Sequence, residues 1–365
     1  MLKQFESNAY GRILPLLQCY EGQDLYAQGI ISGKYDGKVL VDNDQNPTSA
    51  FVLKDGWGNL LGNSNNSAFN AALSNGLTQK KLIDENQAAI FIVDPSISWL
   101  EQLQALIPHR QPIAEPRKIY AAHEPCPISP NPEDCEICFI DESLPEQIDG
   151  KLPGDVQKVL ELRHKSTVPD NSAFGFVVKN GRSCIAWAVV DFIVGTEGEI
   201  RLVTEQAHRQ QGHAARVSGT AINYGLAHGL KRISWNVSDK NIGSIRTAEK
   251  LGITLAESSM EYILIFPEVG YFINLGFSHL DNGRYTQALQ TTKQMIDSGE
   301  QILMQYGYFL AGAARAGLGK NDKALKLLNL AIDNGFSDKG EFQSCHQLTP
   351  LHSHAEWDQL INRLT

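Results

Sequence analysis

Residues 209–214, Arg-Gln-Gln-Gly-His-Ala, combine the residue types that could hold a phosphate group. Gly212 and Ala214 leave the backbone N–H groups uncovered, and the apolar period that starts at Ala214 predicts a helix beginning there. Unpaired N–H groups and the positive end of the helix dipole favour an anion at a helix N-terminus. Ile200 and Leu202 alternate with polar residues just before, so the segment indicates a strand, a phosphate-sized loop and a helix.

A second polar loop follows on the next expected strand. Ile233, Trp235 and Val237 alternate with Ser234 and Asn236 over residues 232–237, as in a strand. Residues 238–244 are polar, and a helix is expected from there to Leu251, with Gly252 ending it by tolerating positive φ. The chain therefore places two polar loops after two successive strands.

Together these segments resemble the acetyl-CoA signature of the GNAT superfamily of N-acetyltransferases. The matching residues are Arg209-x-x-Gly212-x-Ala214, Asn241-x-x-Ser244 and the run Ala248-Glu-Lys-Leu-Gly252. Trp235, Asn241 and Ser244 are in register with the group typified by zwittermicin-resistance acetyltransferases. A Gly-x-Ala alone would indicate a simple turn, and neither Gly-x-Gly-x-x-Gly nor Gly-Lys-Ser/Thr occurs at the loop, so dinucleotide and P-loop sites are not indicated.

The resemblance implies acetyl transfer from acetyl-CoA to an amine by direct attack in a ternary complex. It implies that the strand edge hydrogen-bonds the pantetheine arm, that the loop surrounds the pyrophosphate and that the second loop holds the far side of the cofactor. The implied cofactor-binding residues are Leu202, Val203, Thr204, Arg209, Gln210, Gln211, Gly212, His213, Ala214, Asn241 and Ser244.

Glu199 is the candidate general base, because it is a carboxylate on the central strand that faces away from Ile200 and Leu202. A solvated or salt-bridged glutamate is an equally common explanation for such a residue. Many superfamily members carry a tyrosine general acid where this chain has Ala248, so the candidates for the catalytic acid in its place are Tyr262 and water.

Composition narrows the possible functions. The 365-residue chain is 42% hydrophobic, 20% charged and carries a formal net charge of −9, which argues against a nucleic-acid surface and suits an amine substrate. It shows neither a signal-peptide-like start nor an 18-residue apolar segment, so we expect no membrane association and a cytoplasmic location. Of six cysteines only Cys135 and Cys138 have metal-ligand spacing, and they face opposite ways on an expected strand, so we expect no metal.

The expected fold class is α+β, with two tandem GNAT-like mixed-sheet domains, the first degenerate, followed by an α-helical tetratricopeptide-like tail. A proline-rich linker at residues 124–132 sets the boundaries at 1–124, 125–267 and 268–365. Residues 3–19 are expected to form an opening helix. The first domain lacks a phosphate loop, so we expect one acyl-CoA per chain and a first domain that walls the amine pocket. Trp57 is a candidate wall residue, and an exposed tryptophan in a turn is the commoner explanation for it.

An internal repeat occupies the last hundred residues. Seven residues recur at an offset of 36: Gly276, Gly283, Ala288, Leu289, Ile296, Asp297 and Gly299 return as Gly312, Gly319, Ala324, Leu325, Ile332, Asp333 and Gly335. The pattern is typical of tetratricopeptide helix pairs, which serve equally often as a structural lid and as a groove for a protein partner. Two alternatives to an enzyme therefore stay open: a silent acyl-CoA-binding module and a scaffold that acts through the tail.

Overall fold

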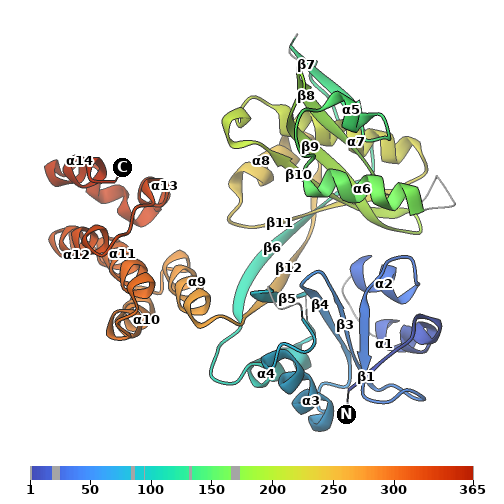
Figure 1. Ribbon diagram of the computed structural model, residues 1–365, viewed down its shortest axis with the longest axis horizontal. Coiled ribbons are helices and arrows are strands. Elements are labelled where there is room, and N and C mark those ends of the chain that lie inside the picture. Colours follow the sequence, from blue (N-terminus) through green and yellow to red (C-terminus); the bar gives the residue numbers. More distant parts are fainter. Residues whose placement is uncertain are drawn as a thin grey trace. The chain divides into compact units, whose positions relative to one another are not determined.

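The computed structural model describes residues 2–18, 25–83, 87–93, 95–130, 134–165 and 173–364 (Figure 1). These residues form two compact units. The first consists of Met1–Leu73, Phe91–Gln102 and Glu115–Tyr262, and the second of Ser74–Ile90, Leu103–Ala114 and Ile263–Thr365.

The described strands form one mixed sheet in the order β1-β2-β3-β4-β5-β12-β6-β11-β10-β9-β8-β7. Their bounds are β1 Lys3–Gln4, β2 Lys38–Val41, β3 Ser49–Lys54, β4 Trp57–Gly62, β5 Ala89–Val93, β6 Ile113–Ala122, β7 Cys135–Phe139, β8 Phe174–Asn180, β9 Ser183–Val194, β10 Glu197–Thr204, β11 Arg232–Ser238 and β12 Thr254–Ile265. β10 pairs parallel with β11, and β4 pairs parallel with β5. The predicted mixed sheets, built twice along the chain, are therefore present.

Helices cover both faces of the strands that precede and follow α7. The helices up to β12 are α1 Leu14–Gln18, α2 Leu25–Ile31, α3 Ser67–Thr78, α4 Ile97–Leu106, α5 Leu144–Gln147, α6 Gly154–Lys165, α7 His213–Ala227 and α8 Ile242–Lys250. Val217 and Ala221 of α7 pack with Ile200 and Ile233 in one buried core. Val156 and Val159 of α6 belong to a second core on the opposite face.

The strands of the first unit come in two halves along the chain, β1 to β6 in the first half and β7 to β12 in the second. Two of them, β6 and β12, are exchanged between the halves in the sheet. β12 comes late in the chain, but it lies between β5 and β6, which come early. β6 in turn pairs antiparallel with β11, from Ile233 opposite Ala122 to Ser238 opposite Arg117. An ion pair between Arg117 and Glu261, 3.3 Å apart, joins β6 and β12. Each half of the sheet is therefore completed by a strand from the other half.

A bulge in β9 gives that strand two different surfaces. Between the pairs Glu197–Val194 and Glu199–Asp191, β9 advances three residues while β10 advances two. The extra residue of β9 falls at or next to Phe192, which has φ 48°. Bulges re-aim neighbouring side chains. Here Asp191 stays opposite Glu199, whereas Phe192 packs in the core of the first half, stacked on Tyr26 at 3.5 Å.

The second unit contains paired helices. They are α9 Glu268–Asp281, α10 Tyr285–Asp297, α11 Gln301–Gly317, α12 Asn321–Asp333, α13 Lys339–Ser344 and α14 Ala355–Asn362. Gly283 and Gly319, equivalent in the repeat, end α9 and α11 with φ 67° and 70°. A side chain at Gly312 would lie 2.8 Å from Leu328, so the small residue lets α11 and α12 approach. The predicted helical region is therefore confirmed as two helix pairs.

Two expected segments differ in the structure. The opening helix is wrong: Lys3–Gln4 is a strand paired with β2, followed by a 3-10 helix Ser7–Ile13 and then by α1, and Cys19 lies outside the described residues. The described part of the linker is held on α7. Asn223 accepts from the Cys126 N–H at 2.6 Å and donates to the Cys126 carbonyl at 3.0 Å. These two hydrogen bonds fix the described part of the proline-rich segment to α7.

Candidate functional site

The strands β10 and β11 part after a short common start. Within the described residues they pair at Glu197–Arg232, Gly198–Ile233 and Glu199–Ser234, although β10 continues to Thr204 and β11 to Ser238. Beyond Glu199, β10 pairs with β9 and β11 pairs with β6. Alternate residues of a strand direct their N–H and C=O groups to each neighbour. The stretch Leu202–Thr204 therefore has a backbone edge on the gap, and binding of the pantetheine arm along this edge stays a prediction.

Residues 209–214, the expected phosphate loop, lie where β10 ends. Gly212 is the N-cap of α7 with φ 81°, and no side chain caps the first turn of this helix. Arg209 donates from Nε to the Thr204 carbonyl at 3.2 Å, which fixes the start of the loop. Because the helix dipole and uncapped N–H groups favour negative charge, this end of α7 can bind an anion.

Several predicted loop residues have structural roles as well. His213 is 2% exposed, so its side chain belongs to the interior and only its backbone can serve a bound anion. Its Nε2 lies 3.2 Å from Gln211 Oε1. Gln210 has φ 63°, a left-handed conformation that is uncommon outside glycine. Ala214, beside them, adds little side chain to cover the loop.

Asn241 and Ser244 begin α8 by binding the protein itself. Asn241 Oδ1 accepts from the Ser244 N–H at 3.1 Å, which is an N-cap. Ser244 Oγ accepts from Trp235 Nε1 at 3.0 Å. Trp235, Asn241 and Ser244 therefore form one hydrogen-bonded turn after β11, which gives their spacing a structural role. Asn241 remains exposed beside its cap.

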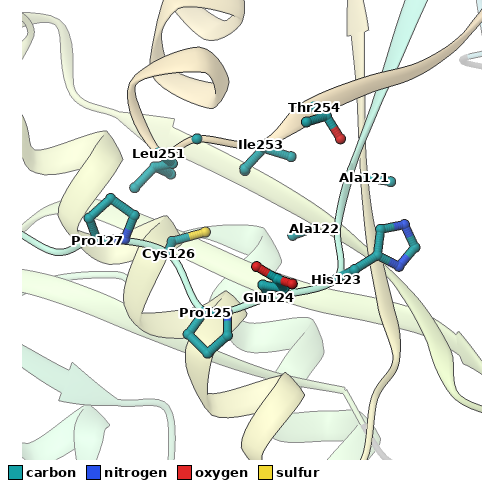
Figure 2. Close-up of a pocket in the computed structure, with 11 residues that line it drawn as sticks. Ala121, Ala122, His123, Glu124, Pro125, Cys126, Pro127, Leu251, Ile253 and Thr254 are labelled. Atoms are coloured by element: carbon teal, nitrogen blue, oxygen red, sulfur yellow. The ribbon is translucent and has the colours of Figure 1, made fainter.

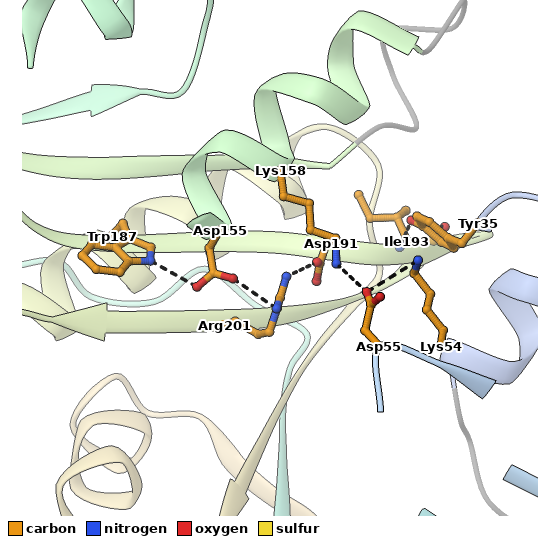
Figure 3. A network of polar contacts seen from close by, with 9 residues as sticks. All are labelled: Tyr35, Lys54, Asp55, Asp155, Lys158, Trp187, Asp191, Ile193 and Arg201. Carbon is orange, nitrogen blue, oxygen red and sulfur yellow. Dashed lines mark hydrogen bonds and ion pairs between the residues drawn. The ribbon is translucent and has the colours of Figure 1, made fainter. Parts of the chain in front are cut away.

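Glu199 lies at the last residue pair before the strands part. On the neighbouring strand β9, Asp191 lies directly opposite Glu199, so the Cβ atoms of these two residues are about 5 Å apart on one face of the sheet. Arg201 follows two residues later on that face and forms an ion pair with Asp191, which is 2% exposed. Figure 3 shows this contact continuing to Asp155 of α6, whose carboxylate is 3.2 Å from Arg201 Nη1 and 3.4 Å from Trp187 Nε1.

The same polar group reaches the first half of the unit. Lys158 of α6 lies 3.3 Å from Asp55, which also pairs with Lys54 at 3.6 Å (Figure 3). Tyr35 OH accepts a hydrogen bond of 2.7 Å from the Ile193 N–H at the bulge, and burial raises its pKa. Trp57 begins β4, half-buried and stacked on Phe91 at 4.7 Å. The first half thus supplies side chains beside the face that carries Glu199.

Burial has the largest effect on the pKa of Asp191 in this polar group. It raises that pKa, and the Arg201 guanidinium opposes the change. Asp191 Oδ1 has no hydrogen-bond partner among the described residues. Asp191 and Arg201 therefore form a partly buried ion pair opposite Glu199, on the same face of the sheet.

Tyr262 is not brought to Glu199. It lies on β12, which β6 separates from β11 in the sheet order. With strands about 4.8 Å apart, Tyr262 is roughly 14 Å from β10. It also points away from its neighbour Glu261, which contacts Arg117, and Arg117 contacts Asn236 on the face of Glu199. Among the predicted site residues, the structure groups Glu199 with the β10 edge and the loop and leaves Tyr262 outside.

Among the described residues of the first half, the start of the corresponding helix is not open to an anion as the start of α7 is. β4 pairs parallel with β5 at Trp57–Phe91 and Gly58–Ile92 and then leads into α3, as β10 leads into α7. The start of α3, however, is capped by Asn66, whose Oδ1 accepts from the Phe69 N–H at 3.1 Å. Asn66 also donates to Asp42 at 2.9 Å. A carboxylate and a side-chain cap occupy the position that an anion would need.

A separate pocket of about 280 Å³ lies at the opposite end of the strands from the loop (Figure 2). It is lined by residues 121–127 and 251–254. Burial raises the pKa of the Cys126 thiol on its wall, so this cysteine stays protonated. Among the described residues there is no group of three His, Cys, Asp or Glu side chains that could hold a metal ion. No described helix is long and apolar enough to cross a bilayer.

Sequence reasoning missed three charged residues near the site: Asp191, Arg201 and Arg216. Asp191 interrupts the apolar run of β9, and such an interruption was a visible signal. Arg216 is 8% exposed and donates to the Gln211 carbonyl at 2.8 Å, beneath the phosphate loop. Its position four residues after Gly212 was also visible, since a cation is unfavourable in the first turns of a helix.

Comparison with known proteins identifies the class of protein. The family model for GNAT acetyltransferases matches residues 18–262, which is more than half of the chain. The chain belongs to the GNAT acetyltransferase family. That family uses acetyl-CoA, and the residues around Gly212 fit a phosphate: a left-handed glycine opens the loop, and the buried Arg216 Nε below it has no hydrogen-bond partner among the residues that the structure describes. No curated protein matches the chain.

Solved structures share the fold at low identity. A GCN5-related N-acetyltransferase-like protein from Streptococcus suis is 18% identical with a TM-score of 0.50, over 70% of this chain and 98% of that one. A tandem GNAT protein from the clavulanic acid biosynthesis pathway is 13% identical with a TM-score of 0.50, over 73% and 98%. A GCN5-related N-acetyltransferase from Sphaerobacter thermophilus is 10% identical, also with a TM-score of 0.50. The predicted acetyltransferase family and tandem fold are confirmed.

Proposed function

We propose that this protein is an acetyl-CoA-dependent N-acetyltransferase that acetylates a primary amine of a small molecule by direct attack in a ternary complex. The observation that carries the proposal is the parting of β10 and β11 at Glu199, with the uncapped start of α7 at the end of β10. One parted strand pair then holds a backbone edge, an anion-binding helix end and a carboxylate together.

Each part of this arrangement has a role. When bound, acetyl-CoA supplies an acetyl group activated as a thioester. The loop at 209–214 holds its pyrophosphate, and the edge at Leu202–Thr204 aligns the pantetheine arm. Glu199 accepts a proton from the amine through a carboxylate oxygen, directly or through water, and Asp191 with Arg201 sets the charge around it. Water is the general acid, because Tyr262 lies two strands beyond β11.

The acceptor class follows from the resemblance to zwittermicin-resistance acetyltransferases and from the acidic chain. An amine of an amino acid, polyamine, aminoglycoside or aminopolyol fits both this resemblance and the acidic charge. The reaction takes place in the cytoplasm. One acyl-CoA binds per chain, because Asn66 and Asp42 fill the helix start in the first half. The paired helices α9–α12 act as tetratricopeptide-like repeats, either for a protein partner or as a structural extension.

Turnover of the thioester tests the proposal. Purified full-length protein is mixed with acetyl-CoA and a panel of the four amine classes, and release of the CoA thiol is followed together with the mass of the acetylated amine. Glu199→Gln is the matched control, expected to lower kcat by about 10²- to 10⁴-fold while acetyl-CoA still binds. Binding without turnover on any amine would support the alternative, a silent acyl-CoA-binding or scaffold protein. Turnover undiminished in Glu199→Gln would remove the base assignment.

A further inference from the structure

Arg216 is a buried cation placed against the phosphate loop. It lies in the second turn of α7 and is 8% exposed. Its Nη2 donates to the Gln211 carbonyl at 2.8 Å and to His213 Nδ1 at 3.0 Å. A Cβ at Gly212 would lie 3.1 Å from Arg216 Nη1. The guanidinium therefore turns back toward the start of its own helix and touches three consecutive loop residues.

The charge of this guanidinium is not balanced by the loop. In the part of the chain that the structure describes, its partners are a carbonyl and an imidazole, and no carboxylate pairs with it. Its Nε has no hydrogen-bond partner. Buried charges in proteins are normally paired, because removing a charge from water is unfavourable.

The surroundings of Arg216 make the imbalance larger. The N-terminus of α7 carries about half a positive charge, so the helix end repels a cation close by. His213 accepts from Arg216 at Nδ1, which places its proton on Nε2 and keeps the imidazole neutral. Burial, and secondly the charge of Arg216, lower the pKa of His213 in agreement with that tautomer. The loop thus has one unpaired positive charge next to the N–H groups at the start of α7.

We propose that Arg216 is an anion-binding residue of the cofactor loop, and that a phosphate group of acetyl-CoA supplies its missing counter-charge. The inference rests on the proposed function, since it names acetyl-CoA as the source of the phosphate. Arg216 then contributes a full charge where the α7 amides contribute only dipoles. The ligand-free protein carries the unfavourable charge, and binding relieves it.

This assignment predicts opposite effects on stability and affinity. In Arg216→Met the thermal midpoint of the ligand-free protein is unchanged or higher, whereas calorimetry gives an acetyl-CoA Kd weaker by about 10- to 100-fold, the range of a charge-assisted hydrogen bond. Arg216→Gln, which keeps an N–H donor for the Gln211 carbonyl without the charge, weakens Kd similarly. Arg284→Met, an exposed arginine before α10, is the control for net charge and leaves both values unchanged.

Inorganic pyrophosphate separates the source of the phosphate from the site itself. It raises the thermal midpoint of the unaltered protein and does so less in Arg216→Gln. A variant with an unchanged Kd and a lowered ligand-free midpoint would show Arg216 to be only structural, and would leave the proposed function standing. Stabilisation by pyrophosphate through Arg216 without any acetyl-CoA binding would keep the anion site and refute the proposed function. Binding of neither compound by the unaltered protein would overturn both.

Discussion

Substituting Asp191 by Asn tests whether its charge tunes the candidate base. Glu199 is faced by Asp191 across β9 and by Ser234 across β11, and Arg201 is the charged neighbour on its own strand. From α6, Asp155 and Lys158 approach the same group. Asp191→Asn removes one negative charge from this set, keeps the shape of the side chain and leaves Arg201 with Asp155 as its carboxylate partner.

The magnitude follows from the cross-strand geometry. Carboxylates on directly opposite residues are roughly 6 Å apart. Two unit charges at that distance interact by about 3 kcal/mol at an effective dielectric constant of 20. Glu199 is partly exposed, and solvent screening reduces this interaction to about 1.4 kcal/mol, a tenfold change in an equilibrium constant. Loss of the like charge favours the charged form of the proton acceptor, so the acid limb of the rate profile moves to lower pH by about 1 unit.

The assay is kcat/KM for the best amine of the panel, measured from pH 5.5 to 9 at saturating acetyl-CoA. Asp155→Asn is the matched control, because Asp155 contacts the same Arg201 from α6 without facing Glu199 across a strand pair. We expect its acid limb to move by less than half as much. An acid limb that stays in place in Asp191→Asn would show that the limb belongs to the amine of the acceptor, and a limb that moves to higher pH would contradict the electrostatic reasoning.

Three further results are expected. Gly212→Val should weaken the calorimetric acetyl-CoA Kd by about a hundredfold in a folded protein, since φ 81° strains valine and its Cβ meets Arg216; an unchanged Kd would contradict the loop assignment. The unfolding free energy, from urea denaturation, should fall as pH drops below about 6.5, because burial lowers the pKa of His213 and the folded chain binds that proton less readily. His213→Asn should flatten this fall in part, the remainder coming from His279, whose pKa burial also lowers; an equally steep fall in the variant would show that His213 is not responsible. Phe309→Ala, at a fully buried ring stacked on Phe336 at 4.6 Å, should cost about 3–5 kcal/mol of helical-repeat stability with acetyl-CoA affinity unchanged, and a loss of affinity would show that the repeats support the cofactor site.

Local patterns predicted the part of the fold that surrounds the loop. The alternation at Ile200 and Leu202, the turn at Gly212 and the helix after it are each encoded within a few residues, and β10, the N-cap and α7 follow them. The helix predicted at residues 3–19 was wrong, and local residues explain part of the error. Gly11 and Pro15 interrupt its apolar period, and pairing of Lys3 with Val41 of β2 turns its start into a strand.

The remaining features depend on contacts between distant residues. Nothing in the period of β12 shows that it will pair between β5 and β6, because strand partners are set by the whole sheet. Asp191 meets Glu199 only because the β9 bulge sets the register between Val194 and Asp191. The roles of Asn241 and Ser244 were inferred as cofactor contacts, and the structure adds a cap and a tryptophan partner that sequence alone cannot distinguish from ligand binding.

The exchanged strands also determine when the protein can finish folding during its synthesis. β5 ends at Val93, and its neighbour β12 begins only at Thr254, about 160 residues later. At roughly 5–20 residues per second, the ribosome needs about 8–32 s to supply that neighbour. Over that interval Ile90 and Ile92, fully buried in the finished protein, belong to a strand with an open edge, and such edges pair with other chains. The edge of β5 therefore has no native neighbour on that side until translation passes residue 265.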